Sequence, residues 1–140
     1  MSVLVDTCVW SAALRRRKIV EDSTEVRELR ALISQGAVVI MGPVRQELLS
    51  GVRSRAQFER LRDHLRAFPD VALQTEDFER AAQHFTAARG RGVQGSNTDF
   101  LICAVAERRD LPIFTTDGEF VRYAEFLPIT LHMPKRRPNT

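Results

Sequence analysis

The chain has very little lysine, little cysteine and no long apolar run. Its 140 residues include lysine only at Lys18 and Lys135, so almost all of its positive charge is arginine. Codon bias in the genome explains this excess about as well as selection for arginine, whose planar guanidinium contacts phosphate through two parallel hydrogen bonds. The net charge of +3 suits a polyanionic partner without requiring one.

The two cysteines, Cys8 and Cys103, form no CxxC pair and have no histidine at the spacing of a structural zinc site. We therefore expect both as small apolar side chains in the core. The three histidines, His64, His84 and His132, are scattered along the chain, and we expect surface or core positions for them rather than metal ligation.

No apolar run approaches the roughly 18 residues that a membrane span needs. The first residues also lack the basic start and apolar core of a signal peptide, so we expect a cytoplasmic protein that does not associate with membranes. With 44% hydrophobic and 28% charged residues, the composition is that of a globular protein. The length fits one domain, which we place at residues 1–133, followed by a basic tail at 134–140 that frays.

Apolar strands alternate with amphipathic helices along the chain. The predicted strands are 2–5, 37–41 and 111–115, with shorter ones at 71–73 and 127–132. The predicted helices are 9–14, a helix from the caps at 22–24 to Gly36, 44–50, 54–68, 76–89 with Phe78, Ala81, Ala82 and Phe85 inward, and a buried one from Asp99 to Ala106. This alternation predicts an α/β fold with a mainly parallel sheet.

Four acidic residues occur where a carboxylate is costly. Asp6 and Asp117 follow predicted strands, whereas Glu47 and Asp99 share a helix face with apolar side chains. Three of the four have an ordinary explanation as well: Asp6 can cap a helix, Asp99 can complete a capping box with Ser96, and Asp117 can form an Asx turn before Gly118.

Placed together, the four acids predict a metal site. The carboxyl ends of neighbouring parallel strands meet at one edge of the sheet, where α/β proteins bind ligands. Four carboxylates there repel one another unless a divalent cation neutralises them, and oxygen-only ligands favour Mg²⁺ or Mn²⁺. Such a metal site is suited to phosphoryl transfer, with a phosphodiester as substrate.

The segments around these acids also resemble a known family. Val3–Trp10, Val44–Gly51, Asp99–Ala106 and Phe114–Phe120 are similar, in order and spacing, to the motifs of PIN-domain ribonucleases, and the chain looks most like the VapC-type toxins of bacterial toxin–antitoxin pairs. The resemblance extends from Val3 to about Phe126. It departs from the family pattern at the bulky Phe100 and in the loop from Gly90 to Gly95, which has no clear counterpart.

The resemblance implies a three-layer α/β/α sandwich around a mainly parallel sheet. It implies that Asp6, Glu47, Asp99 and Asp117 hold one or two Mg²⁺ or Mn²⁺ ions in an endoribonuclease, with Thr7, Thr115 and Thr116 supplying hydrogen bonds. It further implies a homodimer, silenced by a VapB-type antitoxin whose C-terminal segment fills a groove beside the site, with helix 54–68 as one wall.

Arginines are candidates for RNA phosphate contacts, with a solvated surface as the equally open reading: Arg15, Arg16, Arg17, Arg89 and Arg91. Two rival functions remain. A metal-binding RNA adaptor without cleavage fits the same residues, whereas a receiver-like phospho-acceptor domain needs a lysine near the acids, and neither Lys18 nor Lys135 is suitably placed.

Overall fold

The computed structural model describes residues 1–14 and 23–135. Three of the arginines predicted to contact phosphate, Arg15, Arg16 and Arg17, lie outside the described residues, as does most of the tail predicted at 134–140.

The central sheet has three short parallel strands in the order β2-β1-β3. Strand β1 (Val3–Val5) lies in the middle, with Val3 opposite Val38 of β2 (Val38–Val39) and Val5 opposite Phe114 of β3 (Ile113–Phe114). All three residues of β1 are buried, as expected for an apolar strand covered on both faces. The predicted parallel sheet is confirmed, and β1 and β3 are neighbours.

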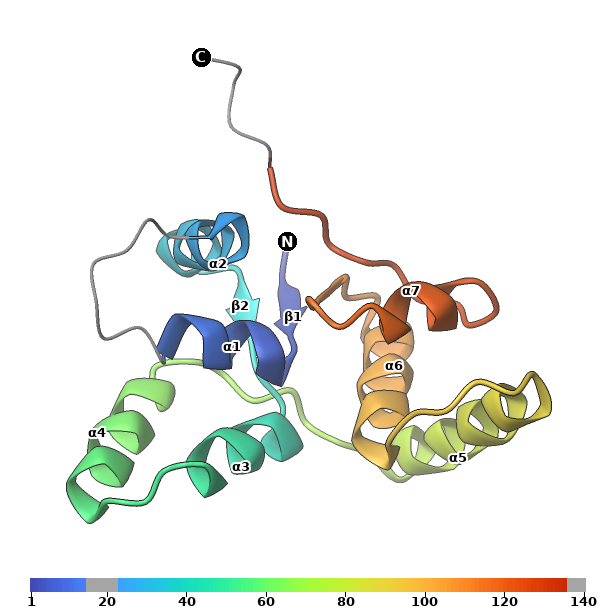
Figure 1. Cartoon of the computed structure of the whole chain (residues 1–140), viewed down its shortest axis with the longest axis horizontal. Helices are drawn as coiled ribbons and strands as arrows, with labels where there is room; N and C mark the ends of the chain where they lie inside the picture. The colour runs from blue at the N-terminus through green and yellow to red at the C-terminus, as the bar shows by residue number, and fades with distance from the viewer. Residues whose placement is uncertain (15–22, 136–140) are drawn as a thin grey trace.

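Helices cover both faces of this sheet (Figure 1). They are α1 (Thr7–Leu14), α2 (Thr24–Ser34), α3 (Gly42–Ser50), α4 (Arg55–Leu65), α5 (Thr75–Gly90), α6 (Asn97–Arg109) and α7 (Glu119–Ala124). Helices α1 and α2 lie on one side of the sheet and α5 and α6 on the other, which confirms the predicted three-layer α/β/α architecture. In the described part of the chain, no helix combines the length and apolarity needed to cross a membrane.

The termini of the helices follow local chemistry. The Ser23 hydroxyl accepts the Val26 N–H at the start of α2, and the Ser96 hydroxyl accepts the Asp99 N–H at the start of α6. Pro43 occupies the first turn of α3, where its missing N–H has no intrahelical partner to lose. Helix α6 is buried along Phe100–Ala106, as its apolar composition predicts.

Two predicted strands and one connection differ from the sequence-based expectation. Segments 71–73 and 127–132 form no strands, because each contributes only a single parallel bridge nearby, Ile40 to Asp70 and Ile113 to Leu131. Residues 119–124, for which no element was predicted, form α7. This helix matters because it contributes Tyr123 to the site described below.

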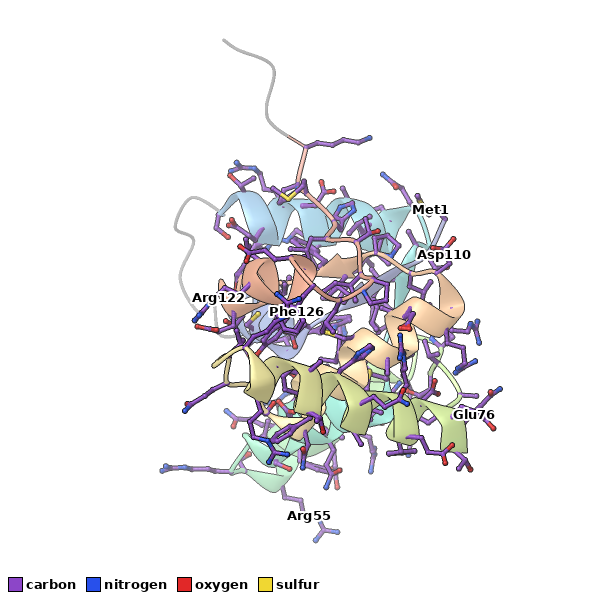
Figure 2. All side chains as sticks on the ribbon, turned by 90° about the vertical axis from the view of Figure 1, so that its right-hand side faces the viewer. Met1, Arg55, Glu76, Asp110, Arg122 and Phe126 are labelled. Atoms are coloured by element: carbon purple, nitrogen blue, oxygen red, sulfur yellow. The ribbon has the colours of Figure 1, made fainter. Side chains whose placement is uncertain are left out.

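The predicted inward face of helix α5 is confirmed only in part, because Ala81 is buried and Phe85 is half-buried against the core. Phe78 is 54% exposed and Ala82 is exposed, whereas the buried positions are Asp77, Ala81, His84 and Ala88. Figure 2 views the molecule from the α5 side, with Glu76 marking the beginning of the helix. The prediction missed the buried position of Asp77 because this carboxylate is buried through an ion pair with Arg108 of α6.

The buried carboxylate of Asp77 on α5 is paired across the interface with α6. Arg108 of α6 donates from Nε to Asp77 Oδ1 at 2.6 Å and from Nη2 to Asp77 Oδ2 at 2.9 Å. Burial raises the pKa of Asp77, but hydrogen bonds from Arg108 and the Gln74 N–H outweigh it and hold that pKa below its ordinary value. His84 Nε2 lies 3.3 Å from Glu107, and burial lowers the pKa of His84.

Candidate active site

Asp6 stands at the carboxyl end of the central strand and is hydrogen-bonded to the end of its neighbour. Its backbone N–H donates to Phe114 O at 2.9 Å, which continues the β1–β3 ladder by one residue. Its carboxylate accepts the Thr7 N–H at 2.8 Å on Oδ1 and the Thr115 hydroxyl at 2.9 Å on Oδ2. The Asp6 carboxylate thus bonds the first N–H of α1 and also reaches across to Thr115, which follows β3.

The Asp6 carboxylate is buried, with only 7% of the residue exposed. Burial raises its pKa, hydrogen bonds from Thr115, Thr7 and Cys8 lower it, and the negative charge of Asp99 raises it again, with a net increase. The charge of Asp99, 93 residues further along the sequence, is therefore close enough to oppose the ionisation of Asp6. A cation placed beside them would reverse this effect.

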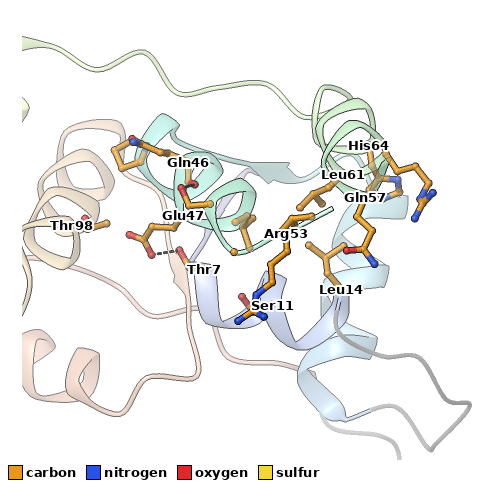
Figure 3. A pocket seen from close by; sticks show the side chains of 16 residues that line it. Thr7, Ser11, Leu14, Gln46, Glu47, Arg53, Gln57, Leu61, His64 and Thr98 are labelled. Atoms are coloured by element: carbon orange, nitrogen blue, oxygen red, sulfur yellow. Dashed lines mark hydrogen bonds between the residues drawn. The ribbon is translucent and has the colours of Figure 1, made fainter. Parts of the chain in front are cut away.

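Glu47 is exposed on α3 and faces the start of α1. The Thr7 hydroxyl donates to Glu47 Oε2 at 3.1 Å, and Figure 3 shows the two side chains pointing toward each other, with Thr98 of α6 nearby. The sequence pattern placed Glu47 on the apolar face of its helix beside Val44 and Leu48. Those two residues are buried, but the carboxylate itself reaches solvent at a groove.

Asp99 is half-buried at the start of α6 and is held by Tyr123 of α7. The Tyr123 hydroxyl lies 3.0 Å from Asp99 Oδ2 and 3.2 Å from the Gln94 carbonyl, so its single proton is shared between two acceptors. Burial and the nearby Asp99 charge raise the pKa of Tyr123, which keeps the hydroxyl protonated as a donor. Ser96 caps α6 as expected, while the Asp99 carboxylate is engaged by Tyr123.

Gly95 makes this contact possible. A Cβ at this position would overlap the Tyr123 hydroxyl and would lie 2.8 Å from Cζ of Phe100. Only a residue without a side chain allows the loop before α6 to approach Tyr123 so closely.

Asp117 forms the Asx turn that the sequence analysis considered for it. It is exposed, its Oδ1 accepts the Glu119 N–H at 3.0 Å just before α7, and its own N–H donates to the Thr115 hydroxyl at 3.0 Å. Its charge is among those that raise the pKa of Tyr123, so it lies at the rim of the same site.

Cys8 corrects the expectation that both cysteines are merely small apolar core residues. Its Sγ lies 3.4 Å from Asp6 Oδ2 and 3.4 Å from the Thr115 hydroxyl, and it accepts the Thr116 N–H at 3.3 Å. Thr116 thus joins the site through its backbone. Cys103, in contrast, is fully buried, and its pKa is raised by burial, as expected for a neutral core thiol.

Thr7 links Asp6 to Glu47 through its N–H and its hydroxyl, and the Thr115 hydroxyl links Asp6 to the backbone N–H of Asp117, whereas Asp99 is bonded to Tyr123. We refer to Asp6, Glu47, Asp99 and Asp117 as the acidic site. Among residues 1–14 and 23–135, no group of three or more His, Cys, Asp or Glu side chains is arranged so that it could hold a metal ion by itself. The hydroxyl groups of Thr7, Thr115 and Tyr123 donate hydrogen bonds to the carboxylates of Glu47, Asp6 and Asp99, respectively.

Comparison with known proteins places this arrangement in a family. The PIN domain model matches residues 3–126, most of the chain. The chain belongs to the PIN-domain family. The resemblance of the four sequence segments to this family is therefore confirmed.

Several solved structures share the fold of this PIN domain. VapBC2 from Rickettsia felis, bound to a DNA fragment from its promoter, has a TM-score of 0.74 at 19% identity, covering 94% of this chain and 98% of that one. FitAcB from Neisseria gonorrhoeae has a TM-score of 0.73 at 22% identity, covering 94% and 97%. VapBC-1 from nontypeable Haemophilus influenzae has a TM-score of 0.73 at 15% identity, again covering 94% and 97%. No match is found among curated proteins.

A groove of about 1170 Å³ extends from the acidic site of this PIN domain along α4 (Figure 3). We call it the α4 groove. Thr7, Glu47 and Thr98 line it at the acidic end, and Leu14, Leu61 and His64 line it at the other. Helix α4 forms one wall, as the sequence pattern suggested, although Phe58 of its apolar stripe is 37% exposed.

The two described arginines among the predicted phosphate contacts lie near the end of α5. The Arg89 guanidinium carbon lies 5.6 Å from the centre of the Phe85 ring, and that of Arg91 lies 4.8 Å from the centre of the Phe126 ring. Both residues are exposed. Their guanidinium groups therefore rest on aromatic side chains within reach of solvent.

Proposed function

We propose that this PIN-domain protein is a metal-dependent endoribonuclease that acts as the toxin of a toxin–antitoxin pair. It would hydrolyse RNA phosphodiester bonds at the acidic site. The observation that carries the proposal is the buried Asp6 carboxylate at the carboxyl end of β1, whose pKa is raised by its burial and by the charge of Asp99. Membership of the PIN-domain family supports nuclease activity.

The donor set fits Mg²⁺ or Mn²⁺. All four acids offer oxygen, and Mg²⁺ keeps several waters and needs only one or two protein carboxylates. Asp6 and Asp99 are the primary ligands in this proposal, with Glu47 and Asp117 completing the set directly or through water. The bound ion would supply an activated water and neutralise the charge of the phosphate.

The hydroxyl groups around the acids orient them. Thr115 and Thr7 hold Asp6 from two sides through the Thr115 hydroxyl and the Thr7 N–H, and the Thr7 hydroxyl also holds Glu47. Tyr123 fixes Asp99 from α7. Each of these carboxylates is thus held by at least one oriented partner, and its remaining lone pairs are left for a cation or for water.

The α4 groove is the site that we assign to the antitoxin. It begins at Glu47 and is lined by both apolar and polar side chains, which suits a short peptide segment better than a small ligand. A VapB-type C-terminal segment lying there would cover the acidic site and block access of RNA. The solved complexes of VapB and VapC proteins with this fold support the assignment.

Three further features belong to the proposal. Arg89 and Arg91, with the arginines at 15–17, would contact RNA phosphates. The protein would be a homodimer, which light scattering of the purified chain can test. It would act in the cytoplasm, where its RNA substrates are made.

RNA cleavage by site variants tests the proposal. Asp6→Asn and Asp99→Asn should lower cleavage of a mixed single-stranded RNA in Mg²⁺ by at least about 100-fold, while circular dichroism and thermal unfolding stay close to wild type. The matched control is Asp63→Asn, an exposed acid of α4, which should cleave normally.

Addition of EDTA separates the nuclease from a metal-binding RNA adaptor. EDTA should abolish cleavage by the wild type, and excess Mg²⁺ should restore it. RNA binding without any cleavage in Mg²⁺ or Mn²⁺ would favour the adaptor, and full activity of Asp6→Asn or Asp99→Asn would refute the assignment of the ligands.

A further inference from the structure

A second, smaller hollow lies next to Asp99 and is not used by the function proposed above. Its walls are Phe85 and Arg89 of α5, the loop 92–95 and Phe100 of α6, and its volume is about 430 Å³. We call it the α5–α6 pocket. Phe100 directly follows Asp99 in the sequence, so the pocket adjoins the acidic site.

The pocket presents flat, aromatic surfaces. The rings of Phe85 and Phe100 meet edge to face with their centres 5.6 Å apart, and the Arg89 guanidinium carbon lies 5.6 Å from the centre of the Phe85 ring. Phe100 is fully buried, but Phe85 is half-buried and Arg89 is exposed. A ligand entering from solvent therefore meets a phenyl ring and a planar cation.

The pocket is joined to the acidic site by one hydroxyl group. Tyr123 bonds both the carbonyl of Gln94, in the pocket wall, and the carboxylate of Asp99. Gly95 lies against both Tyr123 and Phe100, and there is no space for a side chain there. The loop 92–95 and Asp99 are thus held at a fixed separation.

The surrounding surface is cationic at this end of α5. Arg91 rests on Phe126, 4.8 Å from the ring centre, and Figure 2 shows Phe126 toward the end of α5 that lies opposite Glu76. Arg89 and Arg91 therefore place two guanidinium groups beside an aromatic pocket, a combination that complements a base together with its phosphate.

We propose that the α5–α6 pocket binds one base of the RNA strand whose phosphodiester lies at the acidic site. Single-stranded bases stack on aromatic side chains and on arginine guanidinium planes, and such stacking tolerates any base because each has a flat face. Phe85 and Arg89 supply these surfaces, and the charge of Arg89 attracts the adjoining phosphate. The inference rests on the proposed nuclease function, because it assigns a subsite of that active site.

Nucleotide titration followed by NMR tests the pocket without requiring cleavage. The ¹⁵N-labelled protein is titrated with AMP, GMP, CMP and UMP in the absence of metal, and with ribose 5-phosphate as the probe that lacks a base. The backbone amides of residues 92–95 and of Phe100 should shift with the nucleotides, and much less with ribose 5-phosphate.

Two variants and one matched control assign the effect to the pocket. Phe85→Leu keeps an apolar side chain but loses the flat ring, and should weaken nucleotide binding by roughly tenfold. Arg89→Gln alters an exposed side chain without affecting the core, so it keeps the test valid if Phe85→Leu unfolds. Phe78→Leu makes the same change on the exposed face of α5, and should bind like the wild type.

Several results would overturn the inference. Equal shifts with ribose 5-phosphate would show an anion site only. Shifts of the same amides on raising the protein concentration, with none on adding nucleotide, would show that a second copy of the chain covers the pocket. RNA cleavage without nucleotide-induced shifts would refute the base site but not the nuclease function. Nucleotide-induced shifts without any cleavage would refute the nuclease function but not a nucleotide-binding pocket.

Discussion

Tyr123 illustrates how a single side chain can orient a proposed metal ligand. It is fully buried among Phe100 and Phe120, and its hydroxyl reaches Asp99 Oδ2 at 3.0 Å. The aromatic contacts fix the ring, and the fixed ring aims the hydroxyl. Replacing the hydroxyl alone therefore separates packing from orientation.

Tyr123→Phe should keep the aromatic packing and release Asp99. We expect RNA cleavage to fall by about 10- to 100-fold, with a higher Mg²⁺ concentration needed for half-maximal activity, because partners of metal ligands typically contribute this much. The measurement is initial cleavage rate against Mg²⁺ concentration. Thr86→Val, which removes a hydroxyl bonded to Ala82 O on exposed α5, is the control and should change neither quantity. An unchanged Mg²⁺ dependence in Tyr123→Phe would contradict the role given to the hydroxyl.

Gly95→Ala tests the close approach of the loop to Tyr123. The added methyl group would overlap the Tyr123 hydroxyl and crowd Phe100, so the free energy of unfolding should fall by about 1–3 kcal/mol, together with a loss of activity. Gly90→Ala is the control, since nothing lies within 4 Å of its Cβ position at the end of α5, and it should be neutral or slightly stabilising. Chemical denaturation measures the free energy of unfolding of both variants. Equal values for the two would show that the loop moves aside to accommodate the methyl group.

At the scale of single residues, the sequence predicted the site residues that directly follow a strand. It did not predict the residues that join the site only through tertiary contacts. Asp6 and Thr115 follow apolar strands, so their meeting at one sheet edge was predictable. Tyr123 and Gly95 carry no local signal, because Tyr123 bonds Asp99 and Gln94 from a short helix 24 and 29 residues further along the chain. Cys8 looked apolar because its hydrogen bonds come from β1 and β3 only after folding.

Among the elements, the α5–α6 pair depends on a buried ion pair. Asp77 is 1% exposed, and Arg108 binds both of its oxygens as well as the carbonyl of Ala72. The pair therefore fixes the start of α5 against the end of α6. The opposite ends of the same two helices form the α5–α6 pocket.

Asp77→Asn should lower the free energy of unfolding by about 2–4 kcal/mol at neutral pH, because Arg108 loses its partner. The folded pKa of Asp77 is below its unfolded value, so this contribution is complete above about pH 4 and is lost as the pH falls further. Denaturation of wild type and variant between pH 7 and pH 2.5 measures it. A difference between the two that stays constant over this range would contradict the ionised pair.

The elements themselves were largely predictable, and the exceptions have physical causes. The apolar runs of β1, β3 and α6 are fully buried and that of β2 is mostly buried, and their apolar composition alone predicts this. The buried face of helix α5 was predicted only in part, because Asp77 is buried through its pairing with Arg108 of α6, which a periodicity of apolar residues does not detect. Segments 71–73 and 127–132 have strand-like composition, but the only bridges there are those of Asp70, just before the first segment, and of Leu131 in the second.

For the whole molecule, the fold places Asp6, at the carboxyl end of β1, near enough to Asp99 of α6 for the charge of Asp99 to raise the pKa of Asp6. The order β2-β1-β3 places β1 in the centre, and the helices that carry Glu47 and Asp99 start on either side of its carboxyl end. Two hollows adjoin the acidic site, the α4 groove and the α5–α6 pocket. The α4 groove is the proposed antitoxin site, and the pocket is the proposed base site.

Binding of Mn²⁺ tests the central claim most directly, that Asp6 and Asp99 share one divalent cation. Substoichiometric Mn²⁺ should broaden the NMR signals of residues 6–8, 98–100 and 115–117 first, since the paramagnetic ion relaxes the nuclei nearest to it. Excess Mg²⁺ should reverse the broadening, and Asp99→Asn should weaken it by at least about tenfold. Broadening centred elsewhere, or unaltered in Asp99→Asn, would contradict the account.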